Sequence, residues 1–289
     1  MNKNNNAIIL PHVFVVGNEK GGAGKTTCSM HLTAILMEAG LNVASMDTDS
    51  RQHSFTRYME NRKNFKTNNP EIDLKIPNHY LIKQSKATNI AEQEAEEKGL
   101  FEAAFEEATR TADVIIIDTP GSYCFLSRLA HSYADTVITP INDSFLDIDV
   151  IAKIDPSNLT MISPSIYSEM VWQQKMAKAQ RTGRSIEWVI VRNRLSNIST
   201  KNKTQISDVI DTLSKRISLR VAPGFSERVV FREMFLEGLT LLDLIKTQPI
   251  KKLTSSHLAA RQELREFAQF INLDQILKAK EERLANESA

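Results

Sequence analysis

The sequence predicts an α/β fold in which a mostly parallel, doubly wound sheet has helices on both of its faces. Two observations support this fold class. Strand-length runs such as Val13–Val16 and Val114–Ile117 are apolar throughout instead of alternating, as expected for strands buried on both faces. Segments of helical length lie between these runs, and strands that alternate with helices pair in parallel. The 289 residues suffice for one domain with a sizeable core.

Short-range patterns place the individual elements. Gly40 ends a predicted helix over 26–39, because glycine readily takes the left-handed conformation at a helix C-terminus. Phe101, Phe105 and Ala108 recur at helical spacing and predict a helix with one core-facing side. We expect strands at 13–16, 43–46, 114–117, 135–140, 186–191 and 219–223, and further helices at 50–65, 165–180, 201–216 and 257–271.

The chain is interpreted as one domain over residues 12–272. The polar residues 1–11 are expected to form a flexible N-terminus. Residues 62–100 contain prolines and an acidic run, and they predict an irregular insertion with at most a fragment of strand near Leu74–Ile76. The charged residues 273–289 are expected to form a frayed tail.

Composition is that of an ordinary globular protein, with 42% hydrophobic and 25% charged residues and a net charge of +1. The two cysteines, Cys28 and Cys124, have no metal-binding or paired spacing, which favours a reducing compartment. The first residues lack the apolar core of a signal peptide, and no apolar run approaches the ~20 residues of a membrane-spanning helix. We therefore expect a cytoplasmic protein that does not contact a membrane.

A phosphate-binding loop directly follows the first predicted strand. Its glycines allow a tight turn that brings backbone N–H groups against phosphate oxygens, and the next helix begins beneath them. In this pattern Lys25 reaches the β- and γ-phosphates, and the Thr26 hydroxyl ligates Mg²⁺. The residues predicted to bind ATP in the loop are Gly21, Gly22, Ala23, Gly24, Lys25, Thr26 and Thr27.

Three aspartates follow strands whose carboxyl ends meet at the same edge of the predicted sheet. Asp47 and Asp49 end the strand over 43–46, and Asp118 ends the strand over 114–117. We predict that Asp118 holds Mg²⁺ through a water molecule and that Asp47 belongs to the same metal site. The alternative for Asp47 and Asp49 is that they cap the next helix.

The loop departs from the common G-x-x-x-x-G-K-[ST] pattern, because Glu19 stands where the first glycine is expected and Lys20 follows it. The form K-G-G-x-G-K-T-T resembles the deviant P-loop of the ParA/MinD superfamily, and Asp118-Thr-Pro-Gly matches its second motif. The resemblance implies a P-loop NTPase fold and a catalytic set of Lys20, Lys25 and Asp49. Asp49 then orients or deprotonates the attacking water.

In that superfamily the lysine at position 20 crosses a dimer interface to the phosphates of the partner subunit. The resemblance therefore implies a homodimer with ATP held between two subunits. It also suggests that Asn193 and the backbone near Pro223 contact adenine. The alternatives are a surface lysine for Lys20 and a helix N-cap for Asn193.

Three blocks outside the nucleotide motifs resemble the MipZ family, the division-plane positioning ATPases of this superfamily. These blocks are Asn142–Phe145, 228–244 and 257–265, and the whole resemblance runs from about residue 12 to 271 with its weakest part at 62–100. It implies a slow regulatory ATPase with ATP and Mg²⁺ as cofactors, inhibition of FtsZ assembly, association with ParB and non-specific chromosomal DNA, and a nucleoid-associated polar gradient.

Charge is segregated along the chain. Residues 192–232 contain nine basic and three acidic residues, a local charge of +6, whereas residues 92–107 contain seven glutamates and one lysine, a local charge of −6. Such a basic face suits salt-dependent contact with a phosphate backbone, and the alternative is an ordinary solvated helix surface. The candidate DNA-binding residues are Arg194, Lys201, Lys203, Lys215, Arg216 and Arg220.

Two other functions use the same nucleotide motifs. A ParA-type ATPase would partition chromosomes or plasmids, and the blocks after residue 140 argue against it. A metabolic enzyme with a deviant P-loop is the other alternative. The reductase type needs a second cluster cysteine beside Cys124, and the synthetase type needs a motif for a second substrate; the sequence has neither.

Overall fold

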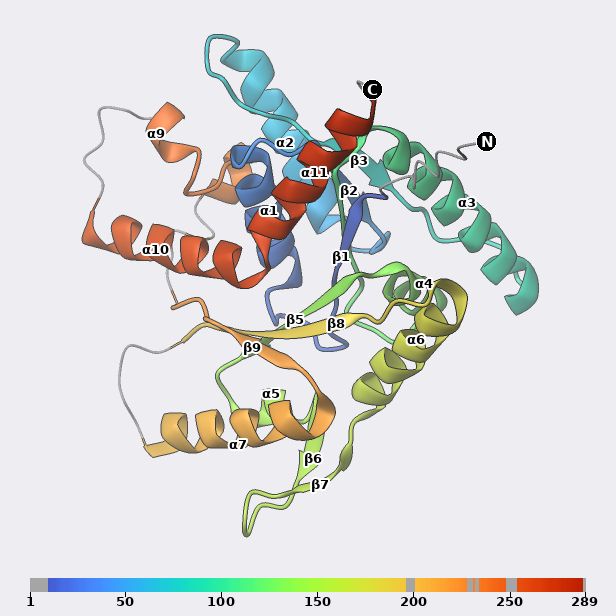
Figure 1. The fold of residues 1–289 in the computed structure, drawn as a ribbon, viewed down its shortest axis with the longest axis vertical. Helices are drawn as coiled ribbons and strands as arrows, with labels where there is room; N and C mark the ends of the chain where they lie inside the picture. Colours follow the sequence, from blue (N-terminus) through green and yellow to red (C-terminus); the bar gives the residue numbers. More distant parts are fainter. Residues whose placement is uncertain (1–9, 196–200, 228–230, 232–233, 248–253, 288–289) are drawn as a thin grey trace, which may run out of the picture.

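The computed structural model describes residues 10–195, 201–227, 231, 234–247 and 254–287. In this part of the chain a seven-stranded sheet has the order β3-β2-β4-β1-β5-β8-β9, and all its pairings are parallel (Figure 1). The strands are β1 (His12–Val16), β2 (Val43–Asp47), β3 (Asn78–Leu81), β4 (Val114–Asp118), β5 (Thr136–Asn142), β8 (Glu187–Asn193) and β9 (Arg220–Ala222).

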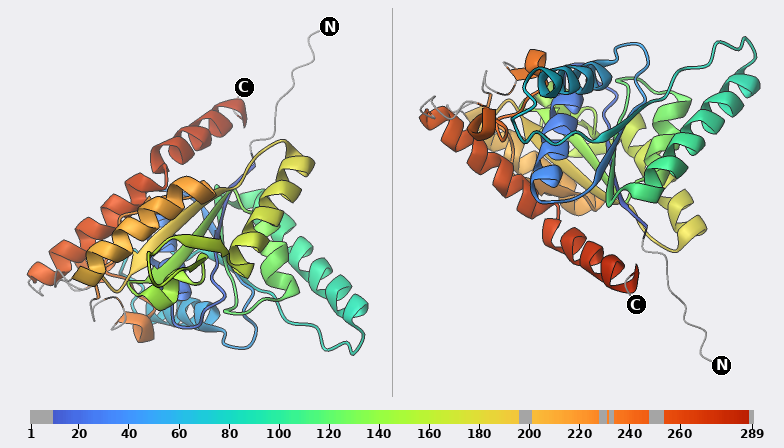
Figure 2. Two further views of the ribbon diagram at one scale, coloured as in Figure 1. Left: turned by 90° about the horizontal axis from the view of Figure 1, so that it is seen from below. Right: turned by 90° about the horizontal axis from the view of Figure 1, so that it is seen from above.

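Successive residues of the central strands enter different cores. Phe14 and Val16 of β1 pack on one face of the sheet, whereas Val13 and Val15 pack on the other. The first face is covered by α1 (Lys25–Glu38), α2 (Ser54–Asn68) and α10 (Ser255–Phe270), and the second by α3 (Ile90–Thr111), α4 (Phe125–Tyr133), α6 (Ile166–Thr182) and α7 (Lys201–Ile217) (Figures 1 and 2). This confirms the predicted doubly wound α/β fold.

The prediction of an irregular insertion over 62–100 was wrong. The end of α2, the edge strand β3 and the first half of α3 all lie in this range, and the strand occupies 78–81 instead of 74–76. β3 escaped prediction because it is short and polar, and its four residues read Asn-His-Tyr-Leu. The Asn89 side chain caps α3 by accepting hydrogen bonds from the amides of Ala91 and Glu92, so the helix starts at Ile90 and contains the acidic run in its first turns.

The prediction of a frayed tail over 273–289 was also wrong for its described part. Leu273–Glu287 forms α11, in which Ile276 is buried. Lys280 and Arg283 of this helix both form ion pairs with the buried Asp113, which directly precedes β4. These ion pairs hold the helix against the rest of the domain. Most of the predicted flexible N-terminus, residues 1–9, lies outside the described residues.

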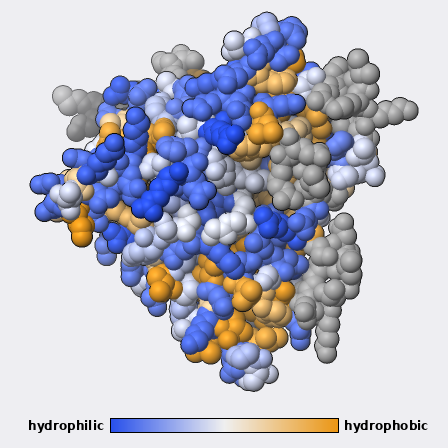
Figure 3. Space-filling model, turned by 180° about the vertical axis from the view of Figure 1, so that it is seen from behind, coloured by the Kyte–Doolittle hydropathy of each residue, from blue (hydrophilic) through white to orange (hydrophobic). Residues whose placement is uncertain are grey.

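An unpredicted excursion follows β5. It comprises the short helix α5 (Phe145–Ile148) and the antiparallel hairpin of β6 (Ala152–Ile154) and β7 (Met161–Pro164). Leu146 and Ile162 are more than half exposed, and Figure 3 shows apolar side chains gathered toward the lower edge of the molecule over these elements. The remaining elements are η1 (Met234–Glu237) and α9 (Leu244–Thr247). No helix in the described residues is long and apolar enough to cross a membrane.

Candidate nucleotide-binding site

The P-loop lies where β1 ends and α1 begins, at the carboxyl edge of the sheet. Gly22 and Gly24 have φ angles of 75° and 94°, in the left-handed region that a side chain disfavours. A Cβ at position 24 would stand 2.2 Å from Nδ2 of Asn193, so a side chain has no room there. These two glycines therefore fix the loop beside the N-terminus of α1, which is a natural anion site.

A cavity of about 820 Å³ opens over this loop. Its floor is formed by Gly21, Gly22 and Gly24 with Lys25, Thr26 and Thr27, which are six of the seven predicted loop residues. Ala23 does not line the cavity because its side chain is buried inside the loop. The other walls come from the segment after β2, from the start of α3 and from the turn after β4, and they include Thr48, Asp49, Arg51, Gln93, Glu94, Pro120, Gly121 and Tyr123.

Lys25 supplies a cation at the floor of the cavity. Its ammonium donates a hydrogen bond to the Lys20 carbonyl across 3.1 Å, which spans the glycine loop. Burial lowers the pKa of Lys25, and the nearby carboxylates of Asp118 and Asp49 oppose that shift. A desolvated ammonium gains more from an anionic ligand than a hydrated one does, so the site is prepared for phosphate.

Asp118 and Thr26 form a polar pair between β4 and α1. The Thr26 hydroxyl donates to Oδ2 of Asp118 across 2.8 Å, and the Ser29 hydroxyl donates to Oδ1 across 2.7 Å. Burial and the neighbouring Asp47 raise the pKa of Asp118 to about 7, and the two hydroxyl donors oppose that shift. Ser29 was missed from sequence, although its spacing of one helical turn after Lys25 places it on the face toward β4.

Asp47 does not line the cavity, although its charge acts on the neighbouring Asp118, and its assignment to the metal site stays a prediction. One carboxylate oxygen accepts from the Asp49 amide across 3.0 Å. The other accepts from the amide and the hydroxyl of Thr56, each across 2.9 Å. Asp47 thus ties the segment after β2 to the first turn of α2, which is the helix-capping alternative weighed from sequence.

Asp49 lines the cavity opposite the P-loop. Its carboxylate oxygen Oδ1 accepts hydrogen bonds from the amides of Arg51 and Gln52. Both bonds go to Oδ1, so they orient the side chain and leave Oδ2 without a bond to either of these amides. The structure therefore places Asp49, Lys25 and Thr26 around one space, as the sequence predicted.

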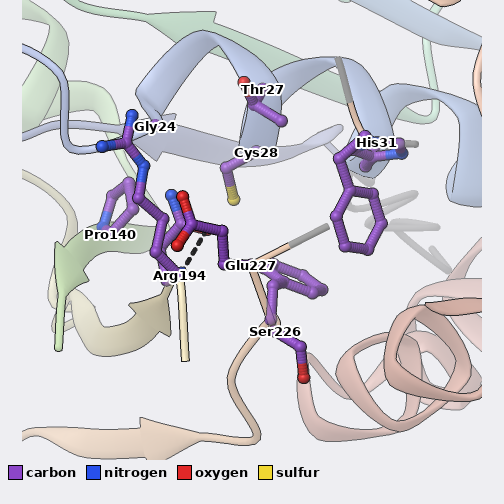
Figure 4. Close-up of a pocket in the computed structure, with 11 residues that line it drawn as sticks. Gly24, Thr27, Cys28, His31, Pro140, Arg194, Ser226 and Glu227 are labelled. Atoms are coloured by element: carbon purple, nitrogen blue, oxygen red, sulfur yellow. Dashed lines mark hydrogen bonds between the residues drawn. The ribbon is translucent and has the colours of Figure 1, made fainter. Parts of the chain in front are cut away.

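A second, smaller pocket adjoins the loop on the side of α1 and has a volume of about 60 Å³ (Figure 4). Thr27, Cys28 and His31 face Ser226 and Glu227 across it. Asn193 also lines the pocket, and its amide donates to the Ala23 carbonyl across 3.0 Å. Asn193 therefore supports the loop backbone from the place where a base was expected.

Pro223 itself does not line this pocket, and the adenine contact predicted for the backbone near it stays a prediction. The residues that follow it in the chain, Phe225, Ser226 and Glu227, form the wall instead. The reason is that β9 ends at Ala222, and Pro223 is exposed while the chain turns back toward the loop. The sequence therefore predicted the region of the chain that forms this wall, but not the individual residues.

Lys20 lies at the mouth of the loop and is paired within its own chain. Its ammonium is 2.6 Å from Oδ1 of Asp147 and donates to the Leu146 carbonyl across 3.2 Å. Asp147 is buried, whereas about two fifths of the Lys20 side chain remains exposed. Sequence patterns gave no sign of this pair because 127 positions separate the two residues.

The candidate DNA-binding residues whose side chains the structure describes lie in different surroundings. Arg194 lines both cavities at the nucleotide site. Arg220 pairs with Glu187, donates to the Phe270 carbonyl and stacks on the Phe270 ring, so it takes part in a structural ion pair, and its contact with DNA stays a prediction. Lys215 and Arg216 are exposed in the last turn of α7, and the side chains of Lys201 and Lys203 lie outside the described part.

Comparison with known protein families identifies the family of this chain. The family model of the ATPase MipZ matches residues 12–275, which is most of the chain. The chain belongs to the ATPase MipZ family. This confirms the resemblance seen in the sequence.

Solved structures outside the MipZ family share the fold. An ATP complex of a McdA variant from Cyanothece is 15% identical with a TM-score of 0.59, over 93% of this chain and 96% of that one. MinD of Pyrococcus horikoshii OT3, complexed with Mg-ADP, is 16% identical with a TM-score of 0.54, over 92% and 98%. The virC1 protein of Rhizobium radiobacter is 31% identical over 131 residues, which are 45% of this chain and 48% of that protein. The chain spans less than half the length of the two curated relatives it matches.

Proposed function

We propose that this member of the MipZ family is a regulatory ATPase that dimerises around ATP, hydrolyses it slowly to ADP and phosphate, and thereby controls placement of the division plane. The observation that carries the proposal is that Lys20 and Lys25 stand at opposite ends of one glycine loop, with Thr26 and Asp49 lining the same cavity. Phosphoryl transfer needs cations on the phosphates and a group that orients water, and these residues supply both.

The donor atoms around Thr26 suit Mg²⁺. The Thr26 hydroxyl is already held toward β4 by Asp118, and both groups offer hard oxygen atoms. Among the described residues, no group of three or more His, Cys, Asp or Glu side chains could form a protein cage for a metal ion. Mg²⁺ suits such a site because it commonly binds one or two protein oxygens together with phosphates and water. When bound, it would neutralise charge on the phosphate oxygens.

The roles of the chain's own residues follow from their places. Lys25 and the amides of the glycine loop bind and orient the triphosphate. Asp118 keeps the Thr26 hydroxyl directed toward the metal position, and Asp49 orients the attacking water from the opposite wall. Lys20 contributes its ammonium to the phosphates of a second subunit, which makes ATP the contact that closes the homodimer.

The proposed partners rest on family membership. They are FtsZ, whose assembly the ATP-bound dimer inhibits, the centromere-binding protein ParB, and non-specific chromosomal DNA. Binding to DNA and ParB would place the protein on the nucleoid in a gradient from the cell poles.

A first experiment tests the dimer switch. We expect Lys20→Ala to abolish ATP-dependent dimerisation while the variant still binds a fluorescent ATP analogue, because Lys25 and the loop amides remain. Light scattering with and without ATP measures the mass of each protein. Lys83→Ala, which removes an exposed lysine beyond β3, serves as the control and should dimerise normally. A Lys20→Ala variant that dimerises like wild type would overturn the proposal.

A second experiment tests the division role. Sedimentation of FtsZ polymers with ATP should recover less polymer when the wild-type protein is present, and Lys20→Ala should not have this effect. Unchanged polymer in both cases would favour a ParA-type partitioning ATPase, which shares the nucleotide motifs but acts on DNA cargo.

A further inference from the structure

Two pockets meet at the P-loop, and three residues line both of them. The cavity over the loop and the smaller pocket beside α1 share Gly24, Thr27 and Arg194. Gly24 and Thr27 belong to the loop and to the first turn of α1, whereas Arg194 comes from the segment that follows β8. Figure 4 shows the Arg194 side chain extending toward Gly24. A ligand that occupies both pockets therefore passes these three residues.

The backbone at Arg194 is held in a conformation that few side chains adopt. Its φ angle is 53°, in the left-handed region. Its amide donates to Oδ1 of Asn193 across 2.9 Å, and the next amide, of Leu195, donates to the Phe225 carbonyl across 2.9 Å. The Leu195 carbonyl accepts from the Glu227 amide across 3.1 Å. Such a conformation persists only where the surroundings enforce it, and it is concentrated at ligand sites.

The guanidinium of Arg194 is not committed to a carboxylate of the described residues. Two positions earlier in the chain, Arg192 forms an ion pair with Asp143, but no acidic side chain that the structure describes pairs with Arg194 in this way. Arg194 is exposed and stands beside the N-terminus of α1, where the loop amides and the helix dipole already favour an anion. Its planar fork of donors suits two oxygens of one phosphate group.

We propose that Arg194 binds the α-phosphate of the nucleotide and belongs to the nucleotide site, not to a DNA-binding face. The inference rests on the proposed function, with the β- and γ-phosphates at Lys25 and the base near Asn193, as expected from the sequence. The α-phosphate joins these two parts of the nucleotide, so it lies at the passage that Arg194 lines with the start of α1. The guanidinium then neutralises this phosphate and leaves the Lys25 ammonium to the terminal ones.

Titration calorimetry of ADP with Mg²⁺ tests the contact without hydrolysis. We expect Arg194→Gln to bind ADP about tenfold more weakly than wild type, as for one lost hydrogen bond to a charged group, and Arg194→Lys to recover part of the loss. Arg184→Gln removes an exposed arginine before the opposite end of β8 and should bind ADP like wild type. Wild-type affinity of Arg194→Gln would overturn the inference.

A glycine variant separates the side chain from the backbone. Arg194→Gly removes the guanidinium but readily adopts the left-handed conformation, so the turn is kept. We expect it to bind ADP as weakly as Arg194→Gln. An Arg194→Gly variant with wild-type affinity would show that only the backbone conformation matters and would contradict a phosphate contact.

The α-thio analogue of ADP identifies the phosphate. Sulfur in place of one α-phosphate oxygen should weaken binding to wild type more than binding to Arg194→Gln, because only wild type has the donor that the sulfur serves poorly. Equal weakening in the two proteins would place the Arg194 contact elsewhere on the nucleotide, which contradicts the proposal.

Retention on DNA distinguishes the other role of Arg194. If Arg194→Gln keeps wild-type affinity for ADP but loses retention on DNA, Arg194 is a DNA contact and the inference fails. If wild type binds ADP but never dimerises with ATP, the proposed dimer switch fails, and the ADP titrations still decide the role of Arg194. A wild-type protein that binds no ADP would overturn both. Thermal unfolding of each variant confirms that the fold is retained.

Discussion

A buried histidine shows how single residues support the loop from behind. Nδ1 of His131 lies 2.7 Å from the Ser127 carbonyl, which can only accept, so the proton resides on Nδ1. Nε2 lies 3.1 Å from the Tyr167 hydroxyl, and that hydroxyl donates its single proton to the Gly17 carbonyl at the start of the P-loop, across 2.8 Å. Burial disfavours the charged form of this ring, so a lowered pKa keeps His131 neutral in the folded protein.

The neutral ring of His131 makes stability depend on pH. Burial lowers its pKa from 6.5 to about 4, and the Ser127 carbonyl opposes that shift. Between these values the unfolded chain binds the proton and the folded chain does not, so stability is lost as the pH falls from 6.5 toward 4. We expect the stability advantage of wild type over His131→Gln to shrink by about 2 kcal/mol between pH 7 and pH 5, since one pKa unit corresponds to about 1.36 kcal/mol. Urea unfolding at both pH values measures it, and a constant difference would contradict a buried neutral ring.

Asn193 gives a second residue-scale prediction. Its amide holds the Ala23 carbonyl and packs against Gly24, so it acts on the loop that binds phosphates. We expect Asn193→Ala to weaken binding of fluorescent ATP and GTP analogues by a similar factor, about threefold to tenfold, as for one lost hydrogen bond. A loss confined to the adenine analogue would instead support the base contact suggested by the sequence. Gln173→Ala, which removes an exposed amide from α6, is the control and should leave both affinities unchanged.

At the scale of elements, one buried ion pair connects α2 to the segment before α9. Both Nη atoms of Arg62 lie 2.9 Å from the Asp243 carboxylate, and its Nε donates to the Lys75 carbonyl across 2.8 Å. Nη1 also donates to the Gly238 carbonyl across 3.0 Å. A single side chain thus joins α2, the loop before β3 and the turn after η1.

We predict that Arg62→Met destabilises the protein by about 3–5 kcal/mol, because it leaves the Asp243 carboxylate buried without its cation. Arg57→Met, on the exposed side of the same helix, should change stability by no more than about 0.5 kcal/mol. Chemical denaturation of the two variants provides the comparison. Equal stabilities would mean that the Arg62 contacts contribute little beyond those of an apolar side chain.

The same contacts explain what could be predicted from sequence at this scale. The central strands, the P-loop and Asp118 carry local signals, namely continuous apolar runs and fixed spacings, and these were predicted correctly. β3, α11 and the Lys20–Asp147 pair depend on residues far apart in the chain. The Arg62 side chain stabilises the loop that leads into β3, and Asp113 anchors α11, yet neither relation leaves a pattern in adjacent residues. The capping bonds of Asp47 could not be told from a metal-binding role in the sequence, because a capping carboxylate and a metal-binding carboxylate have the same position at a strand end.

At the scale of the whole molecule, the charge segregation of the sequence becomes a spatial separation. The acidic α3 lies near the β3 edge of the sheet, and the basic α7 lies near the β9 edge (Figure 1). Exposed Lys215 and Arg216 end α7, where cations also interact favourably with the helix dipole. Arg220, close to them in sequence, is held by Glu187 and the Phe270 ring. The free basic surface is therefore narrower than the sequence suggested.

This difference makes the DNA hypothesis testable residue by residue. If α7 contacts the phosphate backbone, the combined Lys215→Glu and Arg216→Glu variant should lose retention on DNA without losing affinity for ATP, because both side chains are remote from the P-loop cavity. Each lost phosphate contact should also reduce the slope of log affinity against log salt by about 0.9. Lys83→Glu, an equal type of charge reversal at the β3 side, is the matched control and should bind DNA like wild type. Retention of the double variant at wild-type strength across salt concentrations would exclude the end of α7 as a DNA contact, and the basic residues there would then serve solubility and helix stability alone.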